Sequence, residues 1–228
     1  KQNELRTRGV GYIQPRSDFG MAIGDTQYID PLKYSSNLMY IPGFRRIRKL
    51  STTDTQDLMP GSDLATDDQM GFAQKMHPKK YPYEYKVIVE REFLVNSYLM
   101  TGEDSTIHFT SPEKGVERIN SKWERRPIYV VEMTQLDSSY NYSKRILYID
   151  KETFMIHNAL MYDQKGKLWR STDLINTFLP AGAVVTANTF NIQRDHIDTH
   201  SSLHFNLALP DPRIGREVGS IQDLMGTK

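Results

Sequence analysis

Three histidines, His196, His200 and His204, come nearest to a metal-binding motif in type and spacing. On a helix, a spacing of four residues would stack them on one face. The alternation of apolar and polar residues around them favours a strand instead, in which residues four apart are about 13 Å apart. One zinc ion cannot reach all three at that spacing, because its ligands lie about 2 Å from it. We therefore expect a solvated sheet face and no metal site, and a metal-dependent hydrolase is the least favoured function.

Other catalytic patterns are missing from the sequence. It contains no G-x-S-x-G nucleophile elbow, no phosphate-binding Walker loop and no G-x-G-x-x-G dinucleotide motif. The chain has no cysteine, which excludes a thiolate nucleophile and a disulfide. Asp67 and Asp68 are adjacent, so we interpret them as turn or capping residues rather than as a shared acid–base pair. The sequence predicts no catalytic residue and no cofactor, and we do not expect an enzyme.

The composition is balanced in charge and rich in aromatic residues. The 228 residues include 29 basic and 28 acidic residues, for a net charge of +1, which argues against nucleic-acid binding through bulk charge. Thirteen Tyr, nine Phe and ten Met fit a packed β core or an adaptable apolar cavity. No run approaches the roughly 20 apolar residues of a membrane-spanning helix. No signal peptide is visible, and the start at Lys1 is expected of a mature or trimmed chain.

The elements that would position any site are strands, and the clearest of them lie between residues 144 and 172. Three β-prone runs there are separated by two short turn sequences, the first opened by Asp150 and the second by Asp163. Connections this short favour an antiparallel meander, because parallel strands need a crossover of a dozen or more residues.

Alternating apolar and polar residues predict further strands at 81–98 and 196–209, and a hairpin that turns at Arg125 and Arg126. Thr66 begins a capping-box pattern that predicts a helix to about residue 76. Together these elements indicate a mainly β fold, a large curved antiparallel sheet or unclosed β-barrel with a few covering helices. The expected organisation is an irregular N-terminal arm over 1–26, a single β domain over 27–209 and a surface tail over 210–228.

A basic run follows the Pro-Gly turn that ends a short strand predicted at 37–41. Its cationic side chains are interleaved with apolar ones. A solvated strand edge that resists aggregation is the favoured interpretation. The functional alternative is contact with an anionic head group or with a membrane surface. The run contains Arg45, Arg46, Arg48 and Lys49.

Five segments carry a family resemblance. They read YIPGFRRIRKL from residue 40, GSDLATDDQMGF from 61, RRPIYVVEMT from 125, YSKRILYIDKETFMIHNALMYDQKGKLWR from 142 and FLPAGAVV from 178. In order and spacing they resemble a family of Gram-negative envelope proteins, the domain of unknown function numbered thirteen twenty-nine. That family is related to the outer-membrane lipoprotein-sorting proteins LolA and LolB. The resemblance covers about residues 30–190.

The resemblance implies an unclosed antiparallel β-barrel whose concave apolar face is covered by helical elements. In LolA and LolB that face holds the acyl chains of lipoproteins. Family members accompany exporters of the resistance-nodulation-division (RND) type and outer-membrane β-barrel proteins, which are therefore the expected protein partners. The absence of a lipidated cysteine differs from LolB and implies a location in the periplasm. The chain is shorter than many members, so a further N-terminal portion is expected, and no catalytic residues come with the family.

The leading interpretation is a periplasmic, non-enzymatic binding or carrier protein for lipid or another hydrophobic cargo, with peripheral membrane contact. An apolar face needs no polar motif, because each buried methylene contributes about 0.8 kcal/mol. Arg45, Arg46 and Arg48 would meet an anionic head group. The alternative is an adaptor without a small ligand that contacts an envelope transporter or outer-membrane barrel through its sheet edges. The residues expected to supply part of the apolar face are Tyr129, Val131, Met133, Ile146, Tyr148, Phe154, Ile156, Met161 and Trp169.

Overall fold

The computed structural model describes residues 3–11, 19–50, 56–58, 64–73, 82–100, 108–109, 118–119, 122–178 and 184–205. The chain divides into two units, one of Lys1–Thr55 with Pro210–Lys228 and one of Gln56–Leu209. The single domain expected over 27–209 is therefore split between these units, because the strands within residues 27–50 pair inside the first one. The expected tail over 210–228 lies outside the described residues.

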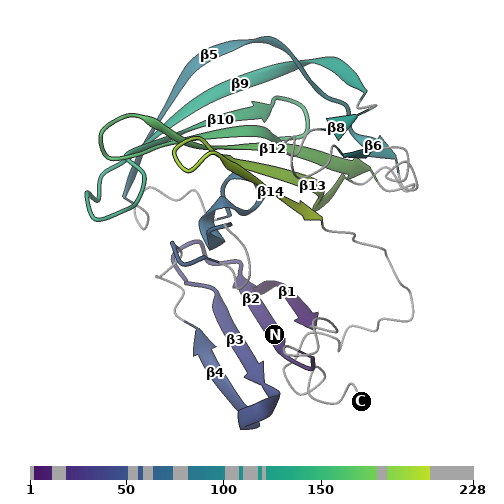
Figure 1. Ribbon diagram of the computed structural model, residues 1–228, viewed down its shortest axis with the longest axis vertical. Coiled ribbons are helices and arrows are strands. Elements are labelled where there is room, and N and C mark those ends of the chain that lie inside the picture. Colours follow the sequence, from purple (N-terminus) through teal and green to yellow (C-terminus); the bar gives the residue numbers. More distant parts are fainter. Residues whose placement is uncertain are drawn as a thin grey trace. The chain divides into compact units, whose positions relative to one another are not determined.

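The first unit contains a four-stranded antiparallel sheet (Figure 1). One of its strands and most of a second lie within residues 1–26, which were expected to form an irregular arm, so that prediction is wrong. The glycines that interrupt the sequence pattern there are tolerated, because Gly9 and Gly24 pair across the two strands and Gly20 adopts a φ of +81°. In sheet order the strands are β1 (Glu4–Gly11), β2 (Ala22–Tyr28), β3 (Ser36–Ile41) and β4 (Arg46–Leu50), with the 3-10 helix η1 (Pro42–Phe44) between the last two.

The second unit is built on one eight-stranded sheet. Its strands are β5 (Tyr83–Asn96), β6 (Leu99–Met100), β9 (Trp123–Gln135), β10 (Lys144–Asp150), β11 (Ile156–Tyr162), β12 (Leu168–Phe178), β13 (Val184–Asp195) and β14 (His200–Phe205). The order is β14-β13-β12-β11-β10-β9-β5, and β6 pairs with β12 in the parallel direction. A separate pair joins β7 (His108–Phe109) to β8 (Arg118–Ile119). The prediction of a mainly β fold with a large antiparallel sheet that is not closed into a barrel is confirmed, and Figure 1 shows the curvature of its strands.

The predicted meander is present as β10, β11 and β12, paired antiparallel in sequence order. Asp150 closes the first turn by accepting hydrogen bonds from the backbone N–H groups of Glu152 and Thr153. Asp163 accepts from two backbone N–H groups of the second turn, where Gly166 has a φ of +78°. Local turn chemistry therefore fixes both connections of the meander.

Strands β5 and β9 form the longest antiparallel pair and depart from the prediction twice. The hairpin expected at Arg125 and Arg126 is wrong, because β9 runs through both residues and pairs with β5 there. A pair of arginines resembles a polar turn in sequence, but Arg126 forms an ion pair with the buried Asp150. A β-bulge between Val87 and Val89 shifts the register of β5. Beyond the bulge, the odd-numbered residues of β5 therefore face the other side of the sheet.

The segment expected to form a capped helix is the short 3-10 helix η2 (Thr66–Gly71), which packs against β11 and β12 (Figure 1). The predicted capping box is wrong, because the N-cap is Ala65 and no side chain caps the helix. Gly71 approaches the sheet closely with a φ of +79°, and the end predicted at residue 76 lies outside the described part of the chain. No helix among the described residues is long and apolar enough to cross a membrane.

Candidate functional site

One face of the large sheet carries the main buried core, and we call it the η2 face. Leu147 of β10 lies between Val131 of β9 and Ala159 of β11 in the ladder, which places all three on this face. Met133 and Met161 extend the same rows and are fully buried with Leu147. Strand alternation puts the intervening residues of β10 on the other side, which we call the opposite face. The η2 face therefore carries a buried apolar core, and the short helix packs on this side of β11 and β12.

A buried ion pair fastens η2 to the η2 face. Nη1 of Arg145 lies 2.8 Å from Oδ1 of Asp68, and both side chains are at most 1% exposed. The Tyr142 hydroxyl donates to Oδ2 of Asp68 at 2.7 Å, and Nε2 of Gln193 donates to the same oxygen at 3.4 Å. Asp68 therefore joins η2 to β10, to β13 and to the loop before β10.

Asp67 and Arg170 extend this network. The Tyr140 hydroxyl donates to Asp67 and accepts from Nη2 of Arg145. Nη1 of Arg170 donates to the Tyr142 hydroxyl at 3.0 Å and lies 3.7 Å from Oδ2 of Asp68. Each charged group thus faces a partner of opposite charge or a hydroxyl, as buried polar groups require.

Electrostatics favour a structural role for the cluster rather than acid–base chemistry. Burial raises the pKa of Tyr142 above its usual range, and the negative charge of Asp68 raises it further. Burial acts to lower the pKa of Arg145, but the charge of Asp68 outweighs it, and that pKa stays well above its usual value. A phenol and a guanidinium held in these forms do not exchange protons near neutral pH. Tyr142 and Arg145 therefore hold Asp68 and η2 in place and do not serve as a general acid or base.

A second buried network closes the other end of β10. Asp150 is fully buried and accepts from Nε of Arg126 at 2.7 Å and from the Tyr98 hydroxyl at 3.3 Å. Burial acts to raise the pKa of Asp150, but its hydrogen bonds with Arg126 and the turn N–H groups outweigh it and lower that pKa. His157 places Nε2 3.5 Å from Asp150, and burial lowers the pKa of this imidazole. The ring is therefore held mainly neutral beside an ionised carboxylate.

The structure divides the nine residues expected to form an apolar face. Ile146 and Tyr148 pack against a second cluster on the opposite face, around Ile128 and Val130. Phe154 lies in the turn before β11 with its side chain 71% exposed. The others lie on the η2 face or pack against its buried cluster: Met133 and Met161 are fully buried, and Tyr129, Val131, Ile156 and Trp169 are partly buried.

The remaining candidates lie apart from this face. Arg45, Arg46 and Arg48 are exposed at the β3–β4 end of the small sheet, which belongs to the first unit. His196 lies in the turn before β14 and bonds Ser171, so the strand predicted from residue 196 begins only at His200. His200 and His204 are within β14, in keeping with the strand interpretation. Within the described ranges, no three His, Cys, Asp or Glu residues are placed to hold a metal ion.

A family described as Protein of unknown function (DUF1329) matches residues 1–204 of the chain. The chain belongs to this family. The expected family is thus confirmed, and no curated protein is similar to this DUF1329 chain in sequence.

Two of the similar solved structures share the fold of this DUF1329 protein, at low sequence identity. A domain from Vibrio parahaemolyticus named for outer membrane lipoprotein sorting has 16% identity and a TM-score of 0.54, over 89% of this chain and 72% of its own. A DUF1329 family protein from Desulfovibrio piger has 15% identity and a TM-score of 0.53, over 93% and 76% of the two chains. A LolA superfamily protein from Nitrosomonas europaea has 18% identity and a TM-score of 0.46, over 90% and 74%.

Sequence reasoning missed the buried networks of this DUF1329 protein. The sequence indicates turn or capping roles for Asp67 and Asp68, yet their partners Tyr140, Tyr142 and Arg145 lie more than 70 positions away. The available signal was the alternation of β10, which places Arg145 on the same face as Leu147. An arginine at an apolar position of a central strand predicts a buried carboxylate partner, because an unpaired buried charge is strongly destabilising.

Proposed function

We propose that this protein is a non-enzymatic carrier for a lipid or another hydrophobic cargo, and that it works in the periplasm of a Gram-negative cell. The observation that carries the proposal is an unclosed sheet whose η2 face has partly buried apolar side chains at the margin of a fully buried core. The fold shared with a domain named for outer membrane lipoprotein sorting supports the same role. RND-type exporters and outer-membrane barrels belong to this proposal as candidate partners.

The cargo surface that we propose is the part of the η2 face that remains partly exposed beside η2. Val131, Ile149 and Ile156 pack at the margin of the buried cluster, and Tyr129 pairs with Ile149 in the ladder. Their apolar surface would bind an acyl chain without a polar motif, since each methylene removed from water contributes about 0.8 kcal/mol. A protein that binds its cargo through such apolar contacts needs no catalytic residues.

The first test is native mass spectrometry of the full chain purified from its own cell envelope, followed by extraction and identification of any released molecule. A defined lipid or other hydrophobic molecule near one per chain is the expected result. A clean ligand-free mass, with no later uptake of a fluorescent fatty acid, would rule out the carrier role. It would leave the adaptor alternative, in which a partner strand adds to an edge strand such as β5.

Two isoleucines of β10 provide a test of which sheet face binds the proposed cargo. Ile149 packs at the η2 face and Ile146 at the opposite face, and both side chains are partly buried. Ile149→Ser is expected to weaken uptake of a fluorescent fatty acid by tenfold or more, because it removes about 2 kcal/mol of apolar contact. Ile146→Ser serves as the matched control and should bind like the wild type. If Ile146→Ser lost binding and Ile149→Ser did not, the cargo would bind to the opposite face instead.

A further inference from the structure

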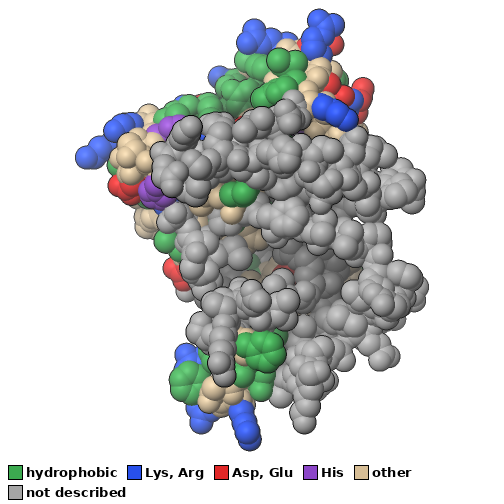
Figure 2. All heavy atoms as spheres, turned by 45° about the vertical axis from the view of Figure 1, so that its right-hand side comes forward, with side chains coloured by type: hydrophobic (Ala, Val, Ile, Leu, Met, Phe, Trp, Pro, Cys, Tyr) green, Lys and Arg blue, Asp and Glu red, His purple; other side chains and the backbone are tan. Residues whose placement is uncertain are grey.

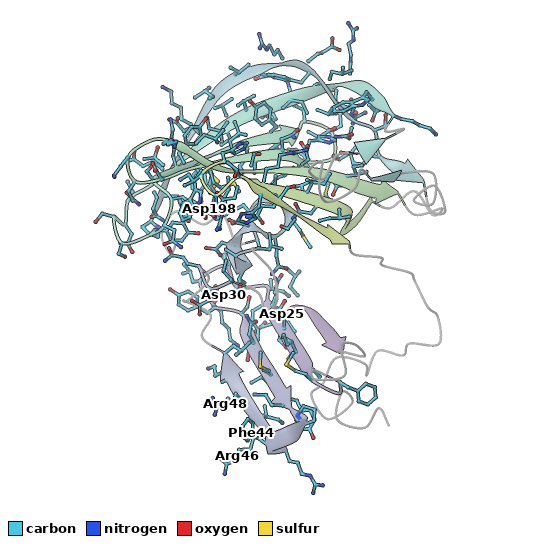
Figure 3. All side chains as sticks on the ribbon, in the orientation of Figure 1. Asp25, Asp30, Phe44, Arg46, Arg48 and Asp198 are labelled. Atoms are coloured by element: carbon cyan, nitrogen blue, oxygen red, sulfur yellow. The ribbon has the colours of Figure 1, made fainter. Side chains whose placement is uncertain are left out.

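The hairpin of β3 and β4 ends in an apolar tip surrounded by cations. Phe44 is 69% exposed in η1 at the tip, and Ile47 of β4 is 46% exposed. Arg46 and Arg48 share one face of β4, and Lys49 lies on the other. Figure 3 shows Phe44, Arg46 and Arg48 at this end of the small sheet, and Figure 2 shows hydrophobic side chains bordered by Lys and Arg side chains there.

The cations of the hairpin are not neutralised within the part of the chain that the structure describes. Arg46, Arg48 and Lys49 are exposed, and so is Arg45 at the end of η1. None of the four has a described carboxylate within salt-bridge distance. The described carboxylates of this unit lie away from the tip: Asp25 pairs with Asn37 near the start of β3, Asp30 follows β2, and Glu4 pairs with Tyr28.

We propose that this hairpin docks the protein, tip first, on an anionic lipid bilayer. An interfacial element buries its apolar side chains about 5–10 Å into the boundary between head groups and acyl chains. Arg46 and Arg48 follow Phe44 in sequence on β4, which leads away from the tip, and they lie about 7 Å apart along that strand. Their guanidinium groups would then reach the depth of the phosphates while Phe44 enters the acyl boundary. The proposal does not depend on the carrier function, since it concerns the first unit alone.

Protection of a sheet edge does not account for all of these features. β4 is the last strand of the small sheet in the described part of the chain, and cations on such a strand discourage pairing with other chains. That role needs no exposed aromatic side chain at the tip, where the backbone has already turned. The combination of Phe44 and Ile47 with four cations matches a surface that is anionic outside and apolar within.

Vesicle flotation of the full chain tests the proposal. We expect binding to vesicles of equal parts phosphatidylcholine and phosphatidylglycerol, little binding to pure phosphatidylcholine, and a loss of binding at high salt. Phe44→Ala should weaken binding about tenfold or more, and Arg46→Gln/Arg48→Gln about 30-fold, or about fivefold for each cation. Phe154→Ala and Arg125→Gln are the matched controls, because both side chains are exposed in the second unit, and each should bind like the wild type.

Tryptophan fluorescence tests whether the tip of the hairpin enters the bilayer. The emission of Phe44→Trp should shift to shorter wavelength on anionic vesicles and be quenched by brominated acyl chains, after subtraction of the signal from the native tryptophans. Equal binding to neutral and anionic vesicles, unchanged binding of both hairpin variants, or no binding at all would overturn the proposal. Retention of an acidic protein by the hairpin, in place of lipid, would overturn it as well.

Discussion

Gly71 allows a direct test of how closely η2 packs on the sheet. Its φ is +79°, and a Cβ added there would lie 2.8 Å from Cγ2 of Ile156 and 3.3 Å from side-chain atoms of Ala159 and Leu174. Gly71→Ala must therefore move η2 away from β11 and β12 or displace these side chains. Overpacking of this kind costs about 1–3 kcal/mol, and the left-handed backbone adds roughly 1–2 kcal/mol for a residue with a Cβ.

Gly166 provides the matched control. Its φ is +78°, and nothing lies within 4 Å of the added Cβ. Gly166→Ala therefore carries the backbone penalty alone, about 1–2 kcal/mol. We expect Gly71→Ala to lower the free energy of unfolding by about 1–3 kcal/mol more than Gly166→Ala does. For a unit of this size, the same difference appears as a Tm lower by roughly 2–12 °C.

Urea unfolding followed by tryptophan fluorescence measures this difference. Trp123 and Trp169 both belong to the second unit, so their emission reports the unit that contains both glycines. The slope of the free energy against urea should stay the same in both variants, because neither substitution changes the surface exposed on unfolding. Equal losses for the two variants would refute the close packing of η2 against the sheet.

Two further predictions concern the buried networks. Asp68→Asn should destabilise the fold by about 3–5 kcal/mol in urea unfolding, since it leaves Arg145 buried without its carboxylate. Asp68→Asn/Arg145→Met should recover part of that loss, and purely additive losses would show that the pair is not coupled. Folding lowers the pKa of His157, so below about pH 6.5 the unfolded chain binds more protons than the folded chain does. The free energy of unfolding should therefore fall between pH 7 and pH 5, by at most about 1.4 kcal/mol per pH unit. His157→Gln should flatten this profile, and an unchanged profile would assign it to other groups.

The meander was predictable from sequence because its information is local. Asp150 and Asp163 bond to backbone groups within four residues, so each turn is specified by a few neighbouring positions. The runs between the turns are rich in β-prone residues, and β10 pairs antiparallel with both neighbours, with one register shift between Tyr148 and Ile149 on the β11 side. Where a segment carries its own turn and pattern, sequence reasoning gave the correct element.

The features that the sequence did not predict depend on contacts between residues far apart in the chain. The bulge at Val87 and Val89 reverses the facing of β5 without any glycine or proline to mark it. The same limit applies to the apolar face, since Ile146 and Val131 look equally apolar and only the ladder places them on opposite sides. The N-terminal strands were missed for the converse reason, because glycines that break a pattern in sequence can pair across two strands, as Gly9 and Gly24 do.

The buried networks also limit the cargo that the proposed carrier could bind. On the η2 face, the cations Arg145 and Arg170 already face Asp68, and Arg170 also bonds Asp195 at 3.1 Å. An anionic head group would have to compete with these carboxylates in a buried setting, where an unpaired charge is strongly unfavourable. At the partly exposed margin around Ile149, an apolar chain would bind without competing with a carboxylate. A cargo would therefore present its apolar portion to this face and keep its polar group in water, so chain length rather than head-group charge should set its affinity.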